Sequence, residues 1–338
     1  MKINMQRWAE DIIAAKDVKI LPILFFPCLE GNGKKIIEVV NNSQAQFENM
    51  KGIIDKYPKM IGAMTGMDLT TEAETFGCDV HFSEIEAPRT INEIVKDRES
   101  AESLKIPSIE SGRGTIFVKA AELASKDITD RPTFGGMLGP FSLAAVLMGL
   151  ETTLKSLKKD PDTVKILLDK CTEYLINYAK AFKEAGANGI LLAEPTAGLL
   201  SPKQCEEFSS YYVKKIVDAV QDEYFFVVLH NCGQTKKMVE SMLGTGAKGY
   251  HFGNAVDMVD IISQIPPRVL VFGNIDPSRV LSHGSTELVK TETLNLLEKM
   301  KPYPHFILSS GCDLPPGVPI ENLDAFFQAL EEFNKSNH

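Results

Sequence analysis

The residues of this chain whose types suit metal chemistry are one histidine and two cysteines, each placed just after an apolar run. His230 and Cys232 follow the run 226–229 (FVVL). Cys312 lies near the end of a second such segment, 305–313 (HFILSSGCD). Continuous apolar runs are typical of buried parallel strands, and in a barrel the carboxyl ends of such strands share one rim. The pattern therefore predicts that one imidazole and two thiols converge and leave a fourth position open, as in a catalytic zinc site.

Taken singly, each of these side chains has a simpler interpretation. A histidine or free cysteine at a strand end is more often packed or hydrogen-bonded than bound to a metal. The combination of a His-x-Cys tip with a Gly-Cys-Asp tip favours the metal site. Two thiolates and an imidazole form a softer, more electron-rich donor set than imidazoles alone, which suits binding of a substrate thiol as its thiolate. Activation of water for hydrolysis is the alternative use of such a zinc.

Other polar residues at expected strand ends are candidates for substrate binding, and each also has a structural alternative. They are Glu194, His251, Asn254, Asn274 and Asp276. Two roles are open for Glu194: it binds the metal when no substrate is present, or it forms a salt bridge at the strand end. His251 suits a hydrogen bond to substrate, a hydrogen bond to a group beside the metal, or a purely structural place. Asp276, in an Asn-Ile-Asp-Pro turn, suits substrate binding or a cap on the following helix.

Strand and helix patterns alternate along the chain. The expected strands span residues 18–26, 133–138, 189–193, 224–229, 249–252, 269–272 and 305–309. Helical segments between them suit crossover connections, so we predict an α/β fold of the (β/α)₈ TIM-barrel type with an N-terminal elaboration. A doubly wound sheet is the alternative, but no G-x-G-x-x-G follows the first strand. We expect a single domain over residues 1–338, in which residues 1–130 carry extra segments over the rim.

Composition narrows the class of protein. The chain has 338 residues and a formal net charge of −9, which argues against a nucleic-acid binder. Its six cysteines contain no CxxC pair, as expected for reduced thiols rather than a disulfide framework. The N-terminus resembles no signal peptide, and the longest strongly apolar run, 20–26, is too short to span a membrane. These features predict a cytoplasmic protein.

Four segments resemble a known family. They are GGMLGPFSLAAVLMG (135–149), FGNIDP (272–277), ETFGCDVHF (74–82) and SSGCDLPPGVPIENLDAF (309–326). With the order of strands and helices, they are similar to the uroporphyrinogen decarboxylase superfamily, and within it to the cobamide-dependent methyltransferase branch that includes methylcobamide:coenzyme M methyltransferases. The resemblance covers nearly the whole chain. The branch carries a His-x-Cys…Cys zinc motif, which matches His230, Cys232 and Cys312 here.

The resemblance implies a reaction and its participants. Zn²⁺ would bind a small-molecule thiol such as coenzyme M. A methylcobamide, carried by a separate corrinoid protein docked at the barrel mouth, would supply the methyl group. Members of the branch can instead run the opposite half-reaction, as the component of a corrinoid-dependent O-demethylase that acts on a methyl donor. This sequence alone favours neither direction.

Two further interpretations remain. Decarboxylases of the superfamily carry an arginine after the first strand to bind substrate carboxylates, whereas residues 25–35 here read FFPCLEGNGKK and contain none. This departure argues against decarboxylation of a porphyrinogen. A corrinoid- or thiol-binding protein without catalysis would keep the barrel and the metal, but would bind without turnover.

Overall fold

The computed structural model describes residues 2–29 and 31–337, and its centre is a sheet of eight parallel strands in the order β1-β10-β9-β8-β7-β6-β5-β2. The strands are β1 (Lys19–Ile20), β2 (Ala63–Met64), β5 (Thr133–Leu138), β6 (Gly189–Ala193), β7 (Phe226–Asn231), β8 (Gly249–Phe252), β9 (Leu270–Ile275) and β10 (Phe306–Ser310). A parallel bridge between Ile20 and Met60 joins β1 to the segment that enters β2. The ends of the sheet therefore meet, and the architecture is the predicted barrel rather than an open doubly wound sheet.

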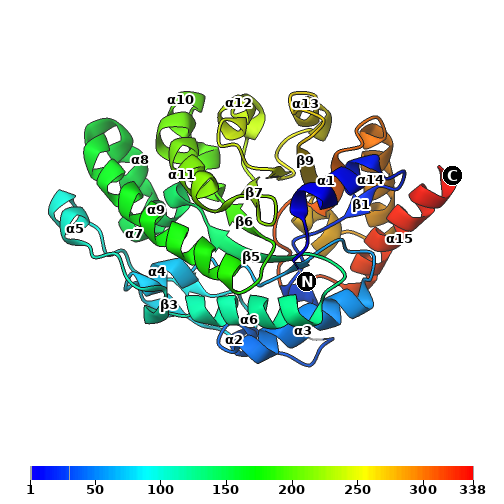
Figure 1. Cartoon of the computed structure of the whole chain (residues 1–338), viewed down its shortest axis with the longest axis horizontal. Helices are drawn as coiled ribbons and strands as arrows, with labels where there is room; N and C mark the ends of the chain where they lie inside the picture. Colours follow the sequence, from blue (N-terminus) through cyan, green and yellow to red (C-terminus); the bar gives the residue numbers. More distant parts are fainter. Residues whose placement is uncertain (1, 30, 338) are drawn as a thin grey trace.

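Helices cover the outside of the sheet, as Figure 1 shows. They are α1 (Met5–Ala14), α2 (Ile36–Val39), α3 (Ser43–Lys56), α4 (Thr71–Thr75), α5 (Arg98–Ser103), α6 (Gly114–Asp127), α7 (Pro140–Met148), α8 (Leu150–Lys159), α9 (Pro161–Glu184), α10 (Pro202–Cys205), α11 (Tyr211–Val220), α12 (Val239–Leu243), α13 (Met258–Ile262), α14 (Thr286–Met300) and α15 (Ile320–Ser336). No helix among the described residues has the length and apolar character needed to cross a membrane.

The strands read as continuous apolar runs because both of their faces are covered. All residues of β5, β6 and β7 are buried, with barrel interior on one side and helices on the other. The long helix α9 begins where the Asp160 side chain accepts the Thr163 N–H, with Pro161 in the first turn. It is followed by Gly186 at a φ of 95°, a conformation that suits glycine at the end of a helix.

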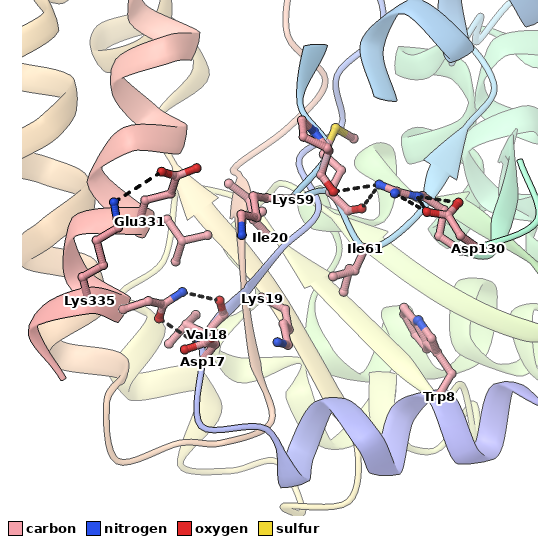
Figure 2. A pocket seen from close by; sticks show the side chains of 15 residues that line it. Trp8, Asp17, Val18, Lys19, Ile20, Lys59, Ile61, Asp130, Glu331 and Lys335 are labelled. Atoms are coloured by element: carbon pink, nitrogen blue, oxygen red, sulfur yellow. Dashed lines mark hydrogen bonds and ion pairs between the residues drawn. The ribbon is translucent and has the colours of Figure 1, made fainter. Parts of the chain in front are cut away.

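Helix α1 lies at the amino-terminal end of the barrel. The Met5 N–H donates to Glu223 O just before β7, and the Trp8 ring lies 6.0 Å from that of Phe134 on β5. Figure 2 shows the pocket of about 460 Å³ that Trp8 and the segments entering β1, β2 and β5 line. Active sites of TIM barrels occupy the opposite end, where the strands finish, so we assign this pocket no part in the chemistry.

One local expectation was wrong, and two elements were not predicted. The first strand is only two residues long instead of spanning 18–26, because Pro22 has no N–H to donate to a ladder, and a short 3₁₀ turn follows at Phe26–Cys28. Strand β2 was missed because two residues between Gly62 and Gly66 carry no periodic signal. Helix α8 was also missed. The segment 83–113 contains β4 (Arg89–Thr90), which pairs with β3 (Val80–His81) as a hairpin, and α5.

Candidate metal centre

The structure brings the three predicted metal ligands together at the carboxyl ends of two strands. His230 is the penultimate residue of β7, Cys232 follows that strand, and Cys312 follows β10. One ligand atom of each lies within 4.8 Å of the others, and Cys312 Sγ is 3.7 Å from His230 Nε2. Strands β8 and β9 separate β7 from β10 in the sheet, so the curvature of the barrel is what makes the three meet.

The turn after β7 positions Cys232 through backbone and amide contacts. The Asn231 side chain accepts the Gly233 N–H at 2.8 Å and donates to Glu194 O at 2.9 Å, which ties this turn to the end of β6. Gly253, just after β8, packs against the same turn, since a Cβ there would lie 2.5 Å from Cys232 Cα. A side chain at position 253 would therefore displace the cysteine.

The two thiols share their protons unequally. Contacts with the Cys312 thiol and with His230 lower the pKa of the Cys232 thiol. The same contact with Cys232, together with burial, raises the pKa of the Cys312 thiol. The pair therefore favours the thiolate on Cys232 over the thiolate on Cys312, and the thiolate is the form that binds metals.

His251 contacts the histidine of this group. Its Nδ1 lies 2.8 Å from His230 Nδ1, and its Nε2 lies 2.8 Å from Ser309 Oγ on β10. The side chain is buried, and the Phe272 ring stacks on it at a centroid distance of 6.3 Å. Of the alternatives open for His251, the structure shows the hydrogen bond to a group beside the candidate metal site.

Glu194 lies outside the group of three ligand atoms and forms no ion pair with a described residue, so the expected salt bridge is wrong. Its carboxylate instead accepts the N–H groups of Phe141 and Ser142, both at 2.9 Å, and the Ser142 hydroxyl at 2.8 Å. These are donors of the first turn of α7, where a negative charge is favourable. Burial nevertheless dominates and raises the pKa of Glu194 to about 7.

The structure places Asn254, Asn274 and Asp276 together on a separate small pocket, whose lining includes none of the three candidate ligands. The Asn274 side chain donates to the backbone oxygens of Gly253 and Val256 at 2.9 and 2.8 Å. The Asp276 carboxylate accepts two backbone N–H groups of the helical turn that follows it, which is the predicted cap. The polar atoms of Asn274 and Asp276 are engaged in shaping loops, and Asn254 is exposed.

Sequence reasoning missed three polar groups near the site. Ser309 holds His251, and the alternation of side chains along β10 was the available signal. Asp313 follows Cys312, its Oδ1 is buried without a hydrogen-bond partner among the described residues, and burial raises the pKa of its carboxyl to about 8. Glu72 on α4 accepts the Leu138 N–H at the end of β5, where β2 is too short to supply a partner. No pattern in the sequence distinguished Glu72.

Comparisons with known proteins place this geometry in context. A family model described as uroporphyrinogen decarboxylase (URO-D) matches residues 29–333. A methylcobamide:CoM methyltransferase of Methanosarcina mazei is 33% identical over 298 residues, which cover 86% of each protein. A uroporphyrinogen decarboxylase of Pseudoalteromonas translucida is 26% identical over 316 residues, covering 89% of this chain and 87% of that protein. A solved methyltransferase from Methanosarcina mazei superposes with a TM-score of 0.86 at 24% identity, covering 97% of this chain and 98% of that one.

Proposed function

Because the chain belongs to the uroporphyrinogen decarboxylase family and gathers an imidazole and two thiols at its barrel rim, we propose that it is a zinc-dependent methyltransferase acting between a corrinoid and a thiol. The predicted family is confirmed by the match over residues 29–333. The predicted branch is confirmed by the similarity to methylcobamide:CoM methyltransferases over 86% of the chain. The observation that carries the reaction is the Cys₂His group.

The donor set fits zinc. Tetrahedral coordination with Zn–S near 2.3 Å and Zn–N near 2.05 Å places a sulfur and a nitrogen ligand about 3.6 Å apart. The observed separation of Cys312 Sγ and His230 Nε2 is 3.7 Å. His230 Nδ1 already faces His251, so Nε2 is the nitrogen that remains for a metal. Three protein ligands leave one position for a substrate, as in catalytic rather than structural zinc sites.

When bound, zinc supplies the Lewis acidity that keeps a coordinated substrate thiol deprotonated near neutral pH. The residues of this chain provide the rest. Cys232 and Cys312 donate electron density that preserves the nucleophilicity of such a thiolate, and His230 completes the set from a buried position. A thiolate held by these three residues would be the nucleophile toward a methyl group carried by the corrinoid, with a carbon–sulfur bond formed and the electron pair of the cobalt–carbon bond left on cobalt.

The methyl donor in this proposal is a methylcobamide carried by a partner corrinoid protein. Support comes from exposed apolar side chains on segments that follow β1, β2 and β6 in the sequence. They are Ile37, Leu69, Ile85, Ile91 and Leu199. Exposed apolar side chains suit contact with another protein. The family resemblance supplies the identity of that protein.

The proposal is tested by anaerobic methyl transfer from methylcobalamin to coenzyme M and to other small thiols, followed by the absorbance of the cobalamin product. We expect about one zinc per chain and thiol-dependent turnover in the wild type, and loss of both in Cys312→Ser. Cys205→Ser is the matched control, because Cys205 is also a free cysteine but lies outside the ligand group. It should retain both properties.

Other outcomes separate the competing functions. A folded wild-type protein without zinc that releases CO₂ from a porphyrinogen would establish the decarboxylase instead. Methylation of cob(I)alamin by an aryl methyl ether, without transfer to any thiol, would assign the O-demethylase direction. Zinc and corrinoid binding without turnover in either direction would leave a binding protein.

A further inference from the structure

The two ring nitrogens of His230 face different groups. Nε2 lies 3.7 Å from Cys312 Sγ, on the side of the candidate metal ligands. Nδ1 lies 2.8 Å from Nδ1 of His251, deeper in the barrel. A contact of 2.8 Å between two imidazole nitrogens requires that one of them donates and the other accepts. The pair therefore shares a single proton in this contact, and two arrangements are available.

Metal binding permits one of the two arrangements. A neutral imidazole that offers the Nε2 lone pair to a metal carries its proton on Nδ1. The His230 Nδ1–H must then donate to His251 Nδ1, which accepts. His251 consequently carries its own proton on Nε2 and donates it to Ser309 Oγ, 2.8 Å away. In the reverse arrangement the proton of His230 occupies Nε2 and blocks the metal.

We propose that His251, held by Ser309, is the positioning residue that accepts the Nδ1–H of His230 when a metal binds and thereby leaves the Nε2 lone pair of His230 for the metal. This inference rests on the proposed function, because it concerns the same zinc site. His251 is not among the three clustered ligand residues, and its hydrogen bond to this group is to His230, through which the proposed role is exerted. The contact with His251 thus turns the His230 ring so that Nε2, and not Nδ1, faces the thiols.

The surroundings keep this chain of hydrogen bonds in one geometry. His251 is 1% exposed and His230 2%, so water does not compete readily for their nitrogens. Phe272 on β9 stacks on the His251 ring with an interplanar angle of 17°, which opposes rotation of the ring. The hydrogen bonds run from His230 on β7 through His251 on β8 to Ser309 on β10, the strand that precedes Cys312. It therefore links the strands that deliver the imidazole and one of the thiols.

The test compares substitutions that keep or remove the acceptor at position 251. In His251→Asn, the side-chain oxygen takes the place of Nδ1 and still accepts from His230. In His251→Phe, the ring shape is kept but the acceptor is lost. His305→Phe is the matched control, because His305 is another buried histidine, at 2% exposure, and its ring nitrogens have no hydrogen-bond partner among the described residues.

The primary measurement is zinc affinity, obtained by competition with a chromophoric chelator on each folded variant. Loss of a hydrogen-bond partner of a metal-binding histidine typically weakens metal binding 10- to 100-fold. We expect a loss of that size for His251→Phe, recovery to within a few-fold of wild type for His251→Asn, and no change for His305→Phe. The absorption spectrum of the cobalt(II)-substituted proteins should show thiolate ligation in all of them.

Equal zinc affinity of wild type and His251→Phe would overturn the inference while leaving the methyltransferase proposal intact. An equal loss in His251→Phe and His251→Asn would also overturn it, because the acceptor would then be irrelevant. A similar loss in His305→Phe would assign the effect to general disruption of the barrel. Absence of zinc from the wild type would instead overturn the proposed function, and the positioning role with it.

Discussion

Glu72 offers a test of how burial controls charge in this protein. Its side chain is 1% exposed, Oε1 accepts the Leu138 N–H at 2.7 Å, and Oε2 has no hydrogen-bond partner among the described residues. Burial, only partly offset by that hydrogen bond, raises the pKa of Glu72 from 4.5 to about 7. The substitution Glu72→Gln keeps the acceptor for Leu138 and removes the titration.

The size and sign of the effect follow from proton linkage. Between pH 4.5 and about 7 the folded state holds a proton on Glu72 that the unfolded chain has lost. The contribution of this group to stability is therefore complete below pH 4.5, declines by about 1.4 kcal/mol per pH unit through the window, and is lost above pH 7. The total is about 3 kcal/mol. Glu72→Gln has no such loss.

Urea unfolding of wild type and Glu72→Gln at pH 5, 6, 7 and 8 measures this difference. We expect the variant to gain about 2.5 kcal/mol relative to wild type between pH 5 and pH 8, because the series starts above the lower end of the window. A difference that stays constant over this range would refute the reasoning. Glu194→Gln is the contrasting control. Both oxygens of ionised Glu194 accept donors of α7, so an amide there would turn its NH₂ against a backbone N–H and destabilise the protein by about 1–3 kcal/mol at pH 8, above the pKa of Glu194.

The remaining predictions concern the loops and the rim. Asn274→Ala removes the two hydrogen bonds to Gly253 O and Val256 O. It should lower the free energy of unfolding by about 2 kcal/mol and speed proteolysis of the loop after β8. An unchanged cleavage pattern would contradict this prediction. Ile85→Asp should raise the KM for a methylated corrinoid protein several-fold and leave that for free methylcobalamin unchanged. An equal rise for both donors would contradict docking at Ile85, which is 77% exposed.

Several elements of the fold could be predicted because their signals are local. Strands β5, β6 and β8 have the predicted bounds, since a continuous apolar run ended by glycine or a polar residue marks a buried strand. The two-residue strands β1 and β2 could not be recognised in the same way. Their place in the sheet depends on pairing with β10 and β5, which are far away in the sequence.

The sequence by itself determined which chemistry is available, because the residue types of His230, Cys232 and Cys312 limit the donors to one nitrogen and two sulfurs. It also indicated that all three follow strands. Only the tertiary structure decided that Nε2 of His230 faces the thiols and that Glu194 serves helix α7. Such assignments depend on contacts between side chains brought together by barrel closure, and neither spacing nor periodicity along the chain encodes the direction in which a ring or carboxylate turns.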